Sequence, residues 1–496
     1  MKIVYGKTGF FIASLVFCAG YSHSGGPSLE TAGSTPTVIQ LPKTPAGEKA
    51  RALLDAINSC DAKAFHRFFD ANLVPSGWRV CLDAFDSQHR FDAVKIESAT
   101  DDDITLLAYA PVTEDWLTIH LKIDPASQLL TEVDVRTKIV FASCMLTDVE
   151  MIKTIETSLD KLVQADAFSG VVLIAKNGIP IFQKAYGIAN KACNMPNNSD
   201  TKFNLGSMNK MFTAIAIGQL AEQGKLSFDD TVGKLLPDYP NKTVAQKVTV
   251  AHLLSHTSGL GGFFNETWEN ASKLRFLKIA DYFSLFVDKP LVFEPGARWR
   301  YSNAGFIVLG AIVEKVSGQD YFEYVREHIY KPAGMSNTDA FELDFDTPNL
   351  AVGYTYENRP QDDKAGSRAA RGPRRNNLFL HGVKGGPAGG GYSTAPDLLR
   401  FAVALQNNKL LSAEMTKVIT TAKPQSFAPD NRYAYGFADH IINGCRVFGH
   451  NGGFAGINAI LDIYPDLGYV VVVMANYDPP AAERVAKKIS GLIIRT

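Results

Sequence analysis

Ser207 and Lys210 have the spacing of a nucleophile and its base. They lie in Gly206-Ser207-Met208-Asn209-Lys210, just before an apolar run that Gly224 closes, and this pattern predicts a buried helix. Residues three positions apart lie on one face of a helix, so the amine can reach the hydroxyl. A serine hydroxyl needs an adjacent base, and burial near the positive end of a helix favours neutral lysine. The pair predicts acyl-transfer chemistry.

Two other Ser-x-x-Lys matches compete with this pair. Ser158 and Lys161 lie on an amphipathic stretch, and we expect them to face solvent. Ser199 and Lys202 follow the turn signal Pro196-Asn197-Asn198. A pattern this short arises by chance in a long chain, so its structural context must decide. Only Ser207 opens a buried helix, and we prefer it for that reason.

Composition and charge restrict the class of protein. The chain has 496 residues, which is too many for one ordinary domain. Its apolar content of 46% and charged content of 20% are typical of a globular protein with a substantial core. The net charge of −1 gives no overall field that would attract nucleic acid, so we expect no nucleic-acid partner.

The N-terminus has the pattern of an export signal. Lys2 and Lys7 precede the short apolar stretch Gly9–Phe17, and small residues follow it. We predict a signal peptide over residues 1–24, a flexible linker over residues 25–46, and a secreted or periplasmic protein. The alternative is a lipoprotein in which Cys18 carries the lipid anchor.

Cysteine and histidine positions argue against a bound metal. Five cysteines remain after signal cleavage: Cys60, Cys81, Cys144, Cys193 and Cys445. Export permits disulfides, and Cys60–Cys81 is the one pairing that we name. The cysteines fit no zinc pattern, and His256, His381 and His450 lack ligand-like spacing. We therefore predict no metal and no cofactor.

Residues 47–140 read as a small α+β domain. Two helices, Glu48–Asn58 and Ala62–Ala71, precede alternating strands, which gives a layered fold. The predicted strands are Val94–Glu97, Ile104–Pro111, Trp116–Ile123 and Leu130–Arg136. The pattern resembles the cystatin-like cone folds of the nuclear-transport-factor-2-like superfamily. We see no catalytic pair in it and expect a role in packing, dimerisation or substrate presentation.

Residues 146–496 read as a second α+β domain. After an amphipathic helix, Asp148–Val163, an Asn-Gly turn joins two strands into a hairpin. Three strands follow much later, and a helix over Ala481–Ile494 comes after them. The three late strands are Arg446–Gly449, Ile457–Tyr464 and Tyr469–Ala475. We predict one antiparallel sheet of two early and three late strands, flanked by the two terminal helices. An all-helical region that carries Ser207 is inserted between the early and late strands.

Five stretches in this domain resemble motifs of one family. They are Phe203-Asn204-Leu205-Gly206-Ser207-Met208-Asn209-Lys210, Leu253-Leu254-Ser255-His256-Thr257-Ser258-Gly259-Leu260, Pro295-Gly296-Ala297-Arg298-Trp299-Arg300-Tyr301-Ser302-Asn303, Ala388-Gly389-Gly390-Gly391-Tyr392-Ser393-Thr394-Ala395-Pro396-Asp397-Leu398 and Gly449-His450-Asn451-Gly452-Gly453. In order and spacing they resemble the serine β-lactamase-like hydrolases of the penicillin-recognising group. The most similar branch holds class C β-lactamases, D,D-carboxypeptidases, D-aminopeptidases and family VIII esterases.

The resemblance implies a role for each residue. Ser207 attacks a carbonyl and becomes acylated, and Lys210 and Tyr301 share the role of base. Tyr301 acts near neutrality only if its pKa falls well below its ordinary value, and we expect the adjacent lysine charge to lower it. Asn303 holds Lys210 and the substrate amide. The backbone N–H groups of Ser207 and Gly453 form an oxyanion hole.

The fifth motif departs from the lactamase pattern. His450-Asn451-Gly452 stands where β-lactamases and carboxypeptidases have Lys-Thr-Gly, whose cation and hydroxyl grip a substrate carboxylate. Histidine is mostly neutral at pH 7, so we expect weaker carboxylate recognition. His450, Gly452 and Gly453 are the implied substrate-binding residues, while His256 is expected to be structural.

These observations predict an exported serine hydrolase that forms an acyl-enzyme on Ser207. Its substrate, a small molecule or a peptide, would be an ester, a D-amino-acid amide or a cell-wall peptide. A class C-like β-lactamase is one alternative. A catalytically silent penicillin-recognising binding protein is the other. The oligomeric state does not follow from the residues.

Overall fold

The computed structural model describes residues 36–59, 62–72, 78–80, 90–141, 146–356, 373–424 and 432–494. The predicted signal peptide, Cys18, the first half of the linker and the Cys60–Cys81 pairing lie outside the described residues. Within the described ranges, no helix combines the length and the apolar character that a membrane crossing requires.

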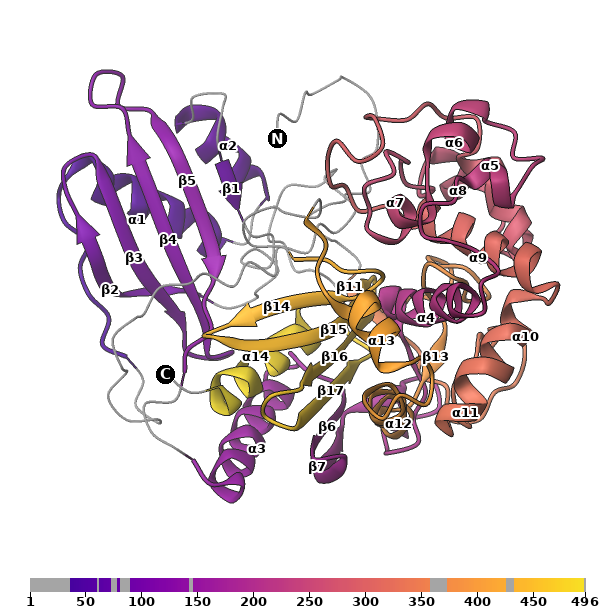
Figure 1. Cartoon of the computed structure of the whole chain (residues 1–496). Coiled ribbons are helices and arrows are strands. Elements are labelled where there is room, and N and C mark those ends of the chain that lie inside the picture. Colours follow the sequence, from indigo (N-terminus) through magenta and orange to yellow (C-terminus); the bar gives the residue numbers. More distant parts are fainter. Residues whose placement is uncertain are drawn as a thin grey trace.

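The N-terminal unit has two helices followed by a sheet, as predicted. α1 (Pro45–Ser59) buries its apolar stripe, which includes Leu53 and Ile57. α2 (Ala62–Asn72) follows it. The described strands are β1 (Trp78–Val80), β2 (Asp92–Ala99), β3 (Asp103–Ala110), β4 (Asp115–Ile123) and β5 (Leu130–Thr137). They are arranged in the order β1-β5-β4-β3-β2, and only β1 pairs in parallel (Figure 1). The cystatin-like identity of this unit stays a prediction.

A six-stranded sheet forms the centre of the second unit as the structure describes it. Its order is β14-β15-β16-β17-β6-β7, and every pairing is antiparallel. The strands are β6 (Gly170–Lys176), β7 (Ile179–Tyr186), β14 (Ala438–Ile442), β15 (Cys445–Phe454), β16 (Ile457–Tyr464) and β17 (Tyr469–Ala475). Because β17 pairs with β6, the two ends of the domain meet in the middle of the sheet. The Asn177-Gly178 turn has positive φ at both residues, as the predicted β6–β7 hairpin requires.

The prediction of five strands was wrong by one. β14 is an additional edge strand with the sequence Ala-Asp-His-Ile-Ile. The sequence did not predict this strand, because Asp439 and His440 break the apolar run that marks a buried strand. Edge strands carry polar side chains more readily, since one backbone edge remains unpaired.

Helices cover both faces of the central sheet. α3 (Asp148–Gln164) and α14 (Ala481–Ile493) pack on one face, around residues such as Val172, Val471 and Ile460. On the other face, Leu173, Val472 and Leu461 join the core of the helical region. Both faces are therefore buried, which explains the continuous apolar run in β17.

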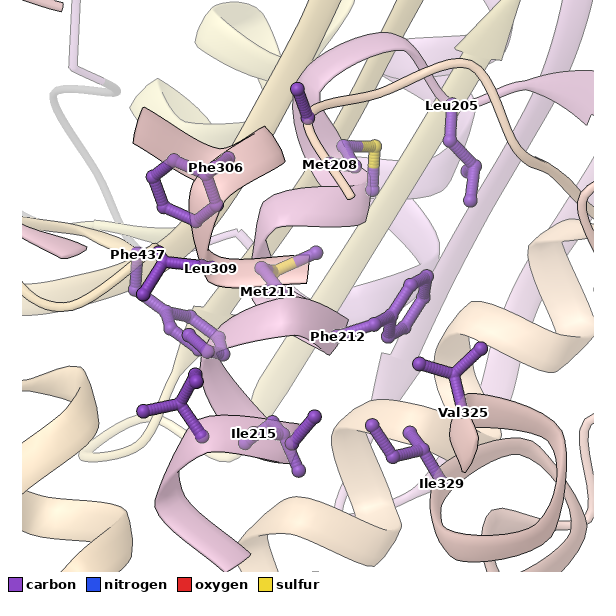
Figure 2. Close-up of a cluster of buried hydrophobic side chains, with 14 of the residues drawn as sticks. Leu205, Met208, Met211, Phe212, Ile215, Phe306, Leu309, Val325, Ile329 and Phe437 are labelled. Atoms are coloured by element: carbon purple, nitrogen blue, oxygen red, sulfur yellow. The ribbon is translucent and has the colours of Figure 1, made fainter. Parts of the chain in front are cut away.

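The helical region is built around two apolar helices. α4 (Asn209–Glu222) is apolar on nearly every side, and α9 (Asn303–Ser317) packs against it. Met211, Phe212 and Ile215 of α4 lie among Phe306, Leu309 and other buried side chains (Figure 2). The other helices of this region are α5 (Val232–Leu235), α6 (Lys242–Lys247), α7 (Val250–Leu254), α8 (Glu266–Asn270), α10 (Tyr321–Val325), α11 (Lys331–Ala333), α12 (Ala395–Gln406) and α13 (Ala413–Thr420).

The expectation that Ser158 and Lys161 face solvent was wrong for Ser158. Ser158 is buried and donates a 2.7 Å hydrogen bond to Glu114, in the β3–β4 turn of the N-terminal unit. Lys161, which is half-exposed, pairs with the same carboxylate at 2.6 Å. Arg484 of α14 donates to Asp115 at 2.8 Å nearby. The polar stripe of α3 that resembles a solvated face therefore contacts the N-terminal unit.

Candidate active site

Ser207 lies in a 3₁₀ turn, Gly206–Met208, that leads into α4. The side chains around it are buried, whereas Ser207 itself is partly exposed, as a nucleophile must be. The glycine-rich fourth motif holds this turn from the other side. The N–H of Leu205 donates to the carbonyl of Gly391 at 2.7 Å, and the N–H of Gly390 donates to the carbonyl of Gly206 at 3.1 Å. This role of the motif was not predicted from the sequence.

Lys210 is fully buried one turn beyond Ser207. Its Nζ donates to Asn303 Oδ1 at 2.7 Å and also to the carbonyl oxygen of Ala388. Burial lowers the pKa of Lys210 well below its ordinary value. A neutral amine has two N–H bonds, and the two acceptors engage both of them. The remaining lone pair is able to accept a proton, which is what a general base requires.

Tyr301 and Asn303 reach the site from the start of α9. Ser302 caps this helix by accepting a hydrogen bond from the N–H of Gly305 at 3.1 Å, so Asn303 is the first helical residue. The ring of Tyr301 lies with its centroid 4.8 Å from Lys210 Nζ. The structure thus brings together Ser207, Lys210, Tyr301 and Asn303, which the motifs had linked.

The expected lowering of the pKa of Tyr301 was wrong. Burial raises the pKa of Tyr301 above its ordinary value, and a hydrogen bond with Ser207 opposes this only in part. Lys210 does not lower the pKa of Tyr301 as expected, because burial favours the neutral amine. A neutral amine does not stabilise a phenolate. The resting site therefore contains a protonated tyrosine beside a lysine with a lowered pKa.

The ring of His256 packs against the ring of Tyr301. It has no exposed surface, and its ring centroid lies 4.2 Å from that of Tyr301. Its Nδ1 accepts the N–H of Ser302 at 3.1 Å, and its carbonyl accepts the N–H of Arg300 at 2.9 Å. These contacts position the Tyr-x-Asn segment, in agreement with the structural role expected for His256.

Gly452 and Gly453 bring β15 against the nucleophile turn. A Cβ at Gly452 would lie 1.9 Å from the carbonyl oxygen of Leu205, so only glycine fits there. A Cβ at Gly206 would lie 3.0 Å from the backbone nitrogen of Gly453. The backbone of Gly453 is therefore adjacent to the turn that carries Ser207. The use of the Ser207 and Gly453 N–H groups as a pair of oxyanion-hole donors stays a prediction.

His450 lies two residues before Gly452 and is buried. Its Nδ1 lies 2.5 Å from the carbonyl oxygen of Asn451, and its Nε2 lies 2.9 Å from the hydroxyl of Tyr433. Burial lowers the pKa of His450 to about 3, and the positive charge that Lys210 gains in acid contributes to the same shift. The imidazole is neutral at physiological pH, as the sequence predicted.

Tyr433 is a residue of the site that the sequence analysis missed. Its ring centroid lies 4.7 Å from that of His256, and its hydroxyl contacts His450. The available signal was the aromatic stretch Tyr433-Ala434-Tyr435-Gly436-Phe437, just before β14. That stretch matches no motif, so only the fold shows which of its rings enters the site. Among the residues that the structure describes, no group of three or more His, Cys, Asp or Glu side chains could hold a metal ion.

Comparison with known proteins identifies the family of the chain. The family model described as Beta-lactamase matches residues 155–494, which is more than half of the chain. The chain belongs to the β-lactamase family. The match includes the central sheet and every site residue described above, whereas α1, α2 and β1–β5 precede it.

Three relatives illustrate where the chain lies in this family. Penicillin-binding protein 4* of Bacillus subtilis (strain 168) is 28% identical over 337 residues, which are 65% of this chain and 71% of that protein. A penicillin-binding protein structure from Bacillus halodurans is 34% identical, with a TM-score of 0.60, and covers 68% of this chain and 99% of its own. The D-amino acid amidase of Ochrobactrum anthropi SV3, solved with D-phenylalanine, shares the fold at 24% identity and a TM-score of 0.58, covering 69% and 98%.

Proposed function

We propose that the chain is an exported serine hydrolase that acts through an acyl-enzyme on Ser207. The single observation that carries this proposal is the buried Lys210. Its pKa is lowered by burial, and its two hydrogen-bond acceptors orient it beside Ser207 and Tyr301. Burial of an amine costs folding free energy. A silent binding protein would gain nothing in return, whereas a hydrolase gains a base with a lowered pKa.

In the proposed reaction, neutral Lys210 takes the proton of the Ser207 hydroxyl while the oxygen attacks a carbonyl. The backbone N–H groups of Ser207 and Gly453 hold the oxyanion that forms. Tyr301, which is protonated in the resting site, donates its proton to the leaving group and is reprotonated from Lys210. Water then hydrolyses the acyl-enzyme by the reverse proton movements.

The substrate in this proposal is an ester, a D-amino-acid amide or a cell-wall peptide. Neutral His450 replaces the cation that grips a carboxylate in enzymes with Lys-Thr-Gly, so efficient β-lactam hydrolysis is not expected. The similarity to penicillin-binding proteins and the shared fold of a D-amino acid amidase support this range of substrates. Export rests on the predicted signal peptide, and N-terminal analysis of the mature protein tests it.

Activity profiling of the full chain tests the proposal. p-Nitrophenyl esters, D-alanyl anilides and nitrocefin are compared for the wild type and for Ser207→Ala, with a fluorophosphonate label read by intact mass. We expect Ser207-dependent labelling and turnover of an ester or amide. Folded protein that shows no Ser207-dependent label would support the binding-protein alternative. A far higher efficiency on nitrocefin would support the β-lactamase alternative.

A further inference from the structure

The contacts of His450 determine which ring nitrogen carries the proton. The carbonyl oxygen of Asn451 only accepts hydrogen bonds, so the Nδ1 that lies 2.5 Å away must donate. In the neutral ring Nε2 then has a lone pair, and the Tyr433 hydroxyl donates to it at 2.9 Å. Both ring nitrogens are engaged within the protein. His450 therefore offers neither a positive charge nor a free N–H to a substrate.

Tyr433 is held firmly in this position. The N–H of Ala434 donates to the carbonyl of Phe437 at 2.8 Å, and the carbonyl of Tyr433 accepts the N–H of Lys423 at 2.9 Å. At the base of the turn, Asp439 has 1% of its surface exposed and accepts a 2.7 Å hydrogen bond from Arg446. A buried, paired carboxylate of this kind orders the backbone around it. The phenol is thus preorganised to face His450.

Several charged or titratable groups face His450 from neighbouring elements. They are Lys210 on α4, His256 after α7, His440 on β14, and the phenol of Tyr433. None of them is an acid that would stabilise a histidine cation. The phenol of Tyr433 is itself neutral, because burial raises its pKa above the ordinary value.

We propose that Tyr433 is a positioning residue that keeps His450 as a neutral, fully hydrogen-bonded ring and thereby selects substrates that carry no carboxylate at this position. The inference rests on the proposed hydrolase function and narrows it to neutral esters and amides. A carboxylate at this position would lose its hydration without gaining a cation or a donor, which is unfavourable. The two hydrogen bonds of His450, to Asn451 and Tyr433, therefore select against a substrate with a carboxylate at this position.

Two matched substrate pairs test this on the full chain. p-Nitrophenyl butyrate and mono-p-nitrophenyl succinate differ by a carboxylate in the acyl part. Benzoylglycyl thioglycolate and its methyl ester differ by a carboxylate in the leaving group. For at least one pair we expect the wild type to favour the neutral compound about tenfold or more in kcat/KM at about pH 7.5. Equal efficiency within both pairs would overturn the proposal.

The variant Tyr433→Phe removes the donor to Nε2 and keeps the ring. The ring is then no longer held as the Nδ1–H tautomer and can present an Nε2–H to a substrate carboxylate, so we expect the preference for the neutral substrate to shrink about threefold or more at about pH 7.5, mainly through KM of the charged substrate. Tyr435→Phe is the matched control. Tyr435 lies two positions after Tyr433 in the same segment, and its ring packs on Phe228 and Lys423. An unchanged preference in Tyr433→Phe would contradict the proposal.

Nitrogen-15 NMR of the histidine rings tests the pair without any turnover. The His450 signals are assigned by their loss in His450→Gln. We expect the Nδ1–H tautomer in the wild type, with no titration between about pH 5 and pH 8. An Nε2–H ring or a cation in that range would overturn the proposal whether or not Tyr433→Phe folds. If no substrate is turned over but the tautomer is as expected, the hydrolase function fails and the Tyr433–His450 pair stands.

Discussion

The amine of Lys210 donates a 2.7 Å hydrogen bond to the amide oxygen of Asn303, and this contact joins the start of α4 to the start of α9. The carbonyl of Ala388 accepts a second hydrogen bond from the same amine. Three segments far apart in the sequence therefore determine the orientation of one buried amine. This amine and the hydroxyl of Ser207 lie in the same candidate active site.

Loss of the Lys210 amine should remove most of the activity. Lys210→Ala deletes the base that takes the Ser207 proton, and we expect kcat/KM to fall about a hundredfold to ten thousandfold. Steady-state kinetics on the best ester measures this. Lys161→Ala is the control, because it removes the lysine of a competing Ser-x-x-Lys pair that contacts Glu114. Retention of activity in Lys210→Ala would exclude Lys210 as the base.

The activity should rise with pH on the acid side. Burial lowers the pKa of Lys210, so its neutral form is present below the pH at which an exposed lysine loses its proton. Burial raises the pKa of Tyr301, so its proton remains available to the leaving group in mildly alkaline solution. We expect kcat/KM, measured over the pH range in which the protein stays folded, to rise with pH to a plateau. It should decline only in strongly alkaline solution. A decline that begins below neutrality would contradict these assignments.

The protein should lose stability in mild acid because of buried neutral histidines. Burial lowers the pKa to about 3 for His450 and to about 4 for His440. In the unfolded chain both bind a proton below about pH 6.5, whereas in the native state they do not. The unfolding free energy therefore falls as the pH drops from that value towards about 4, by about 1.4 kcal/mol per pH unit for each histidine.

Urea unfolding at a series of pH values measures this loss. His450→Gln should show a smaller pH dependence, because one of the buried rings no longer titrates on unfolding. For each of these rings the sign is definite, since it binds a proton in the unfolded state and not in the native state throughout this window. Asp462, whose pKa burial raises to about 7, titrates in the opposite direction and offsets about one of them. Stability that does not change with pH in this range would contradict the buried neutral state of these rings.

Gly452 should not tolerate a side chain. In Gly452→Ala the added methyl group would overlap the carbonyl of Leu205, so β15 must move away from the nucleophile turn. A shift of about 1 Å in the oxyanion hole is expected to cost about a hundredfold in kcat. Gly261→Ala is the control, because a Cβ there meets no atom within 4 Å. Equal activity of the two variants would separate Gly452 from catalysis.

The contact between the two units should depend on Glu114. Glu114→Gln weakens the hydrogen bonds from Ser158 and the pairs with Lys161 and Lys488, and we expect a loss of about 1–3 kcal/mol in unfolding free energy. Denaturant unfolding measures this, and Glu132→Gln in the N-terminal sheet is a surface control. Activity under stable conditions should stay the same, since Glu114 contacts no site residue. Unchanged stability would show that this contact contributes little.

Much of the fold follows from local patterns in the sequence. β17 was predicted to the residue, because a continuous apolar run between turn residues marks a strand buried on both faces. The Asn177-Gly178 turn was predicted because few residues other than asparagine and glycine adopt positive φ easily. β14 was not predicted, because an edge strand has no such requirement for apolar side chains.

The sequence by itself determined which residues carry the chemistry, since Ser207, Lys210, Tyr301 and Asn303 lie in motifs whose order is distinctive. Only the tertiary structure decided their protonation states, because burial depends on neighbours from distant segments. It placed Lys210 where its neutral form is favoured and raised the pKa of Tyr301, against expectation. It also brought Tyr433 to His450, a contact that no local pattern encodes. Spacing along a chain specifies a motif, whereas the desolvation that sets a pKa exists only after the chain has folded.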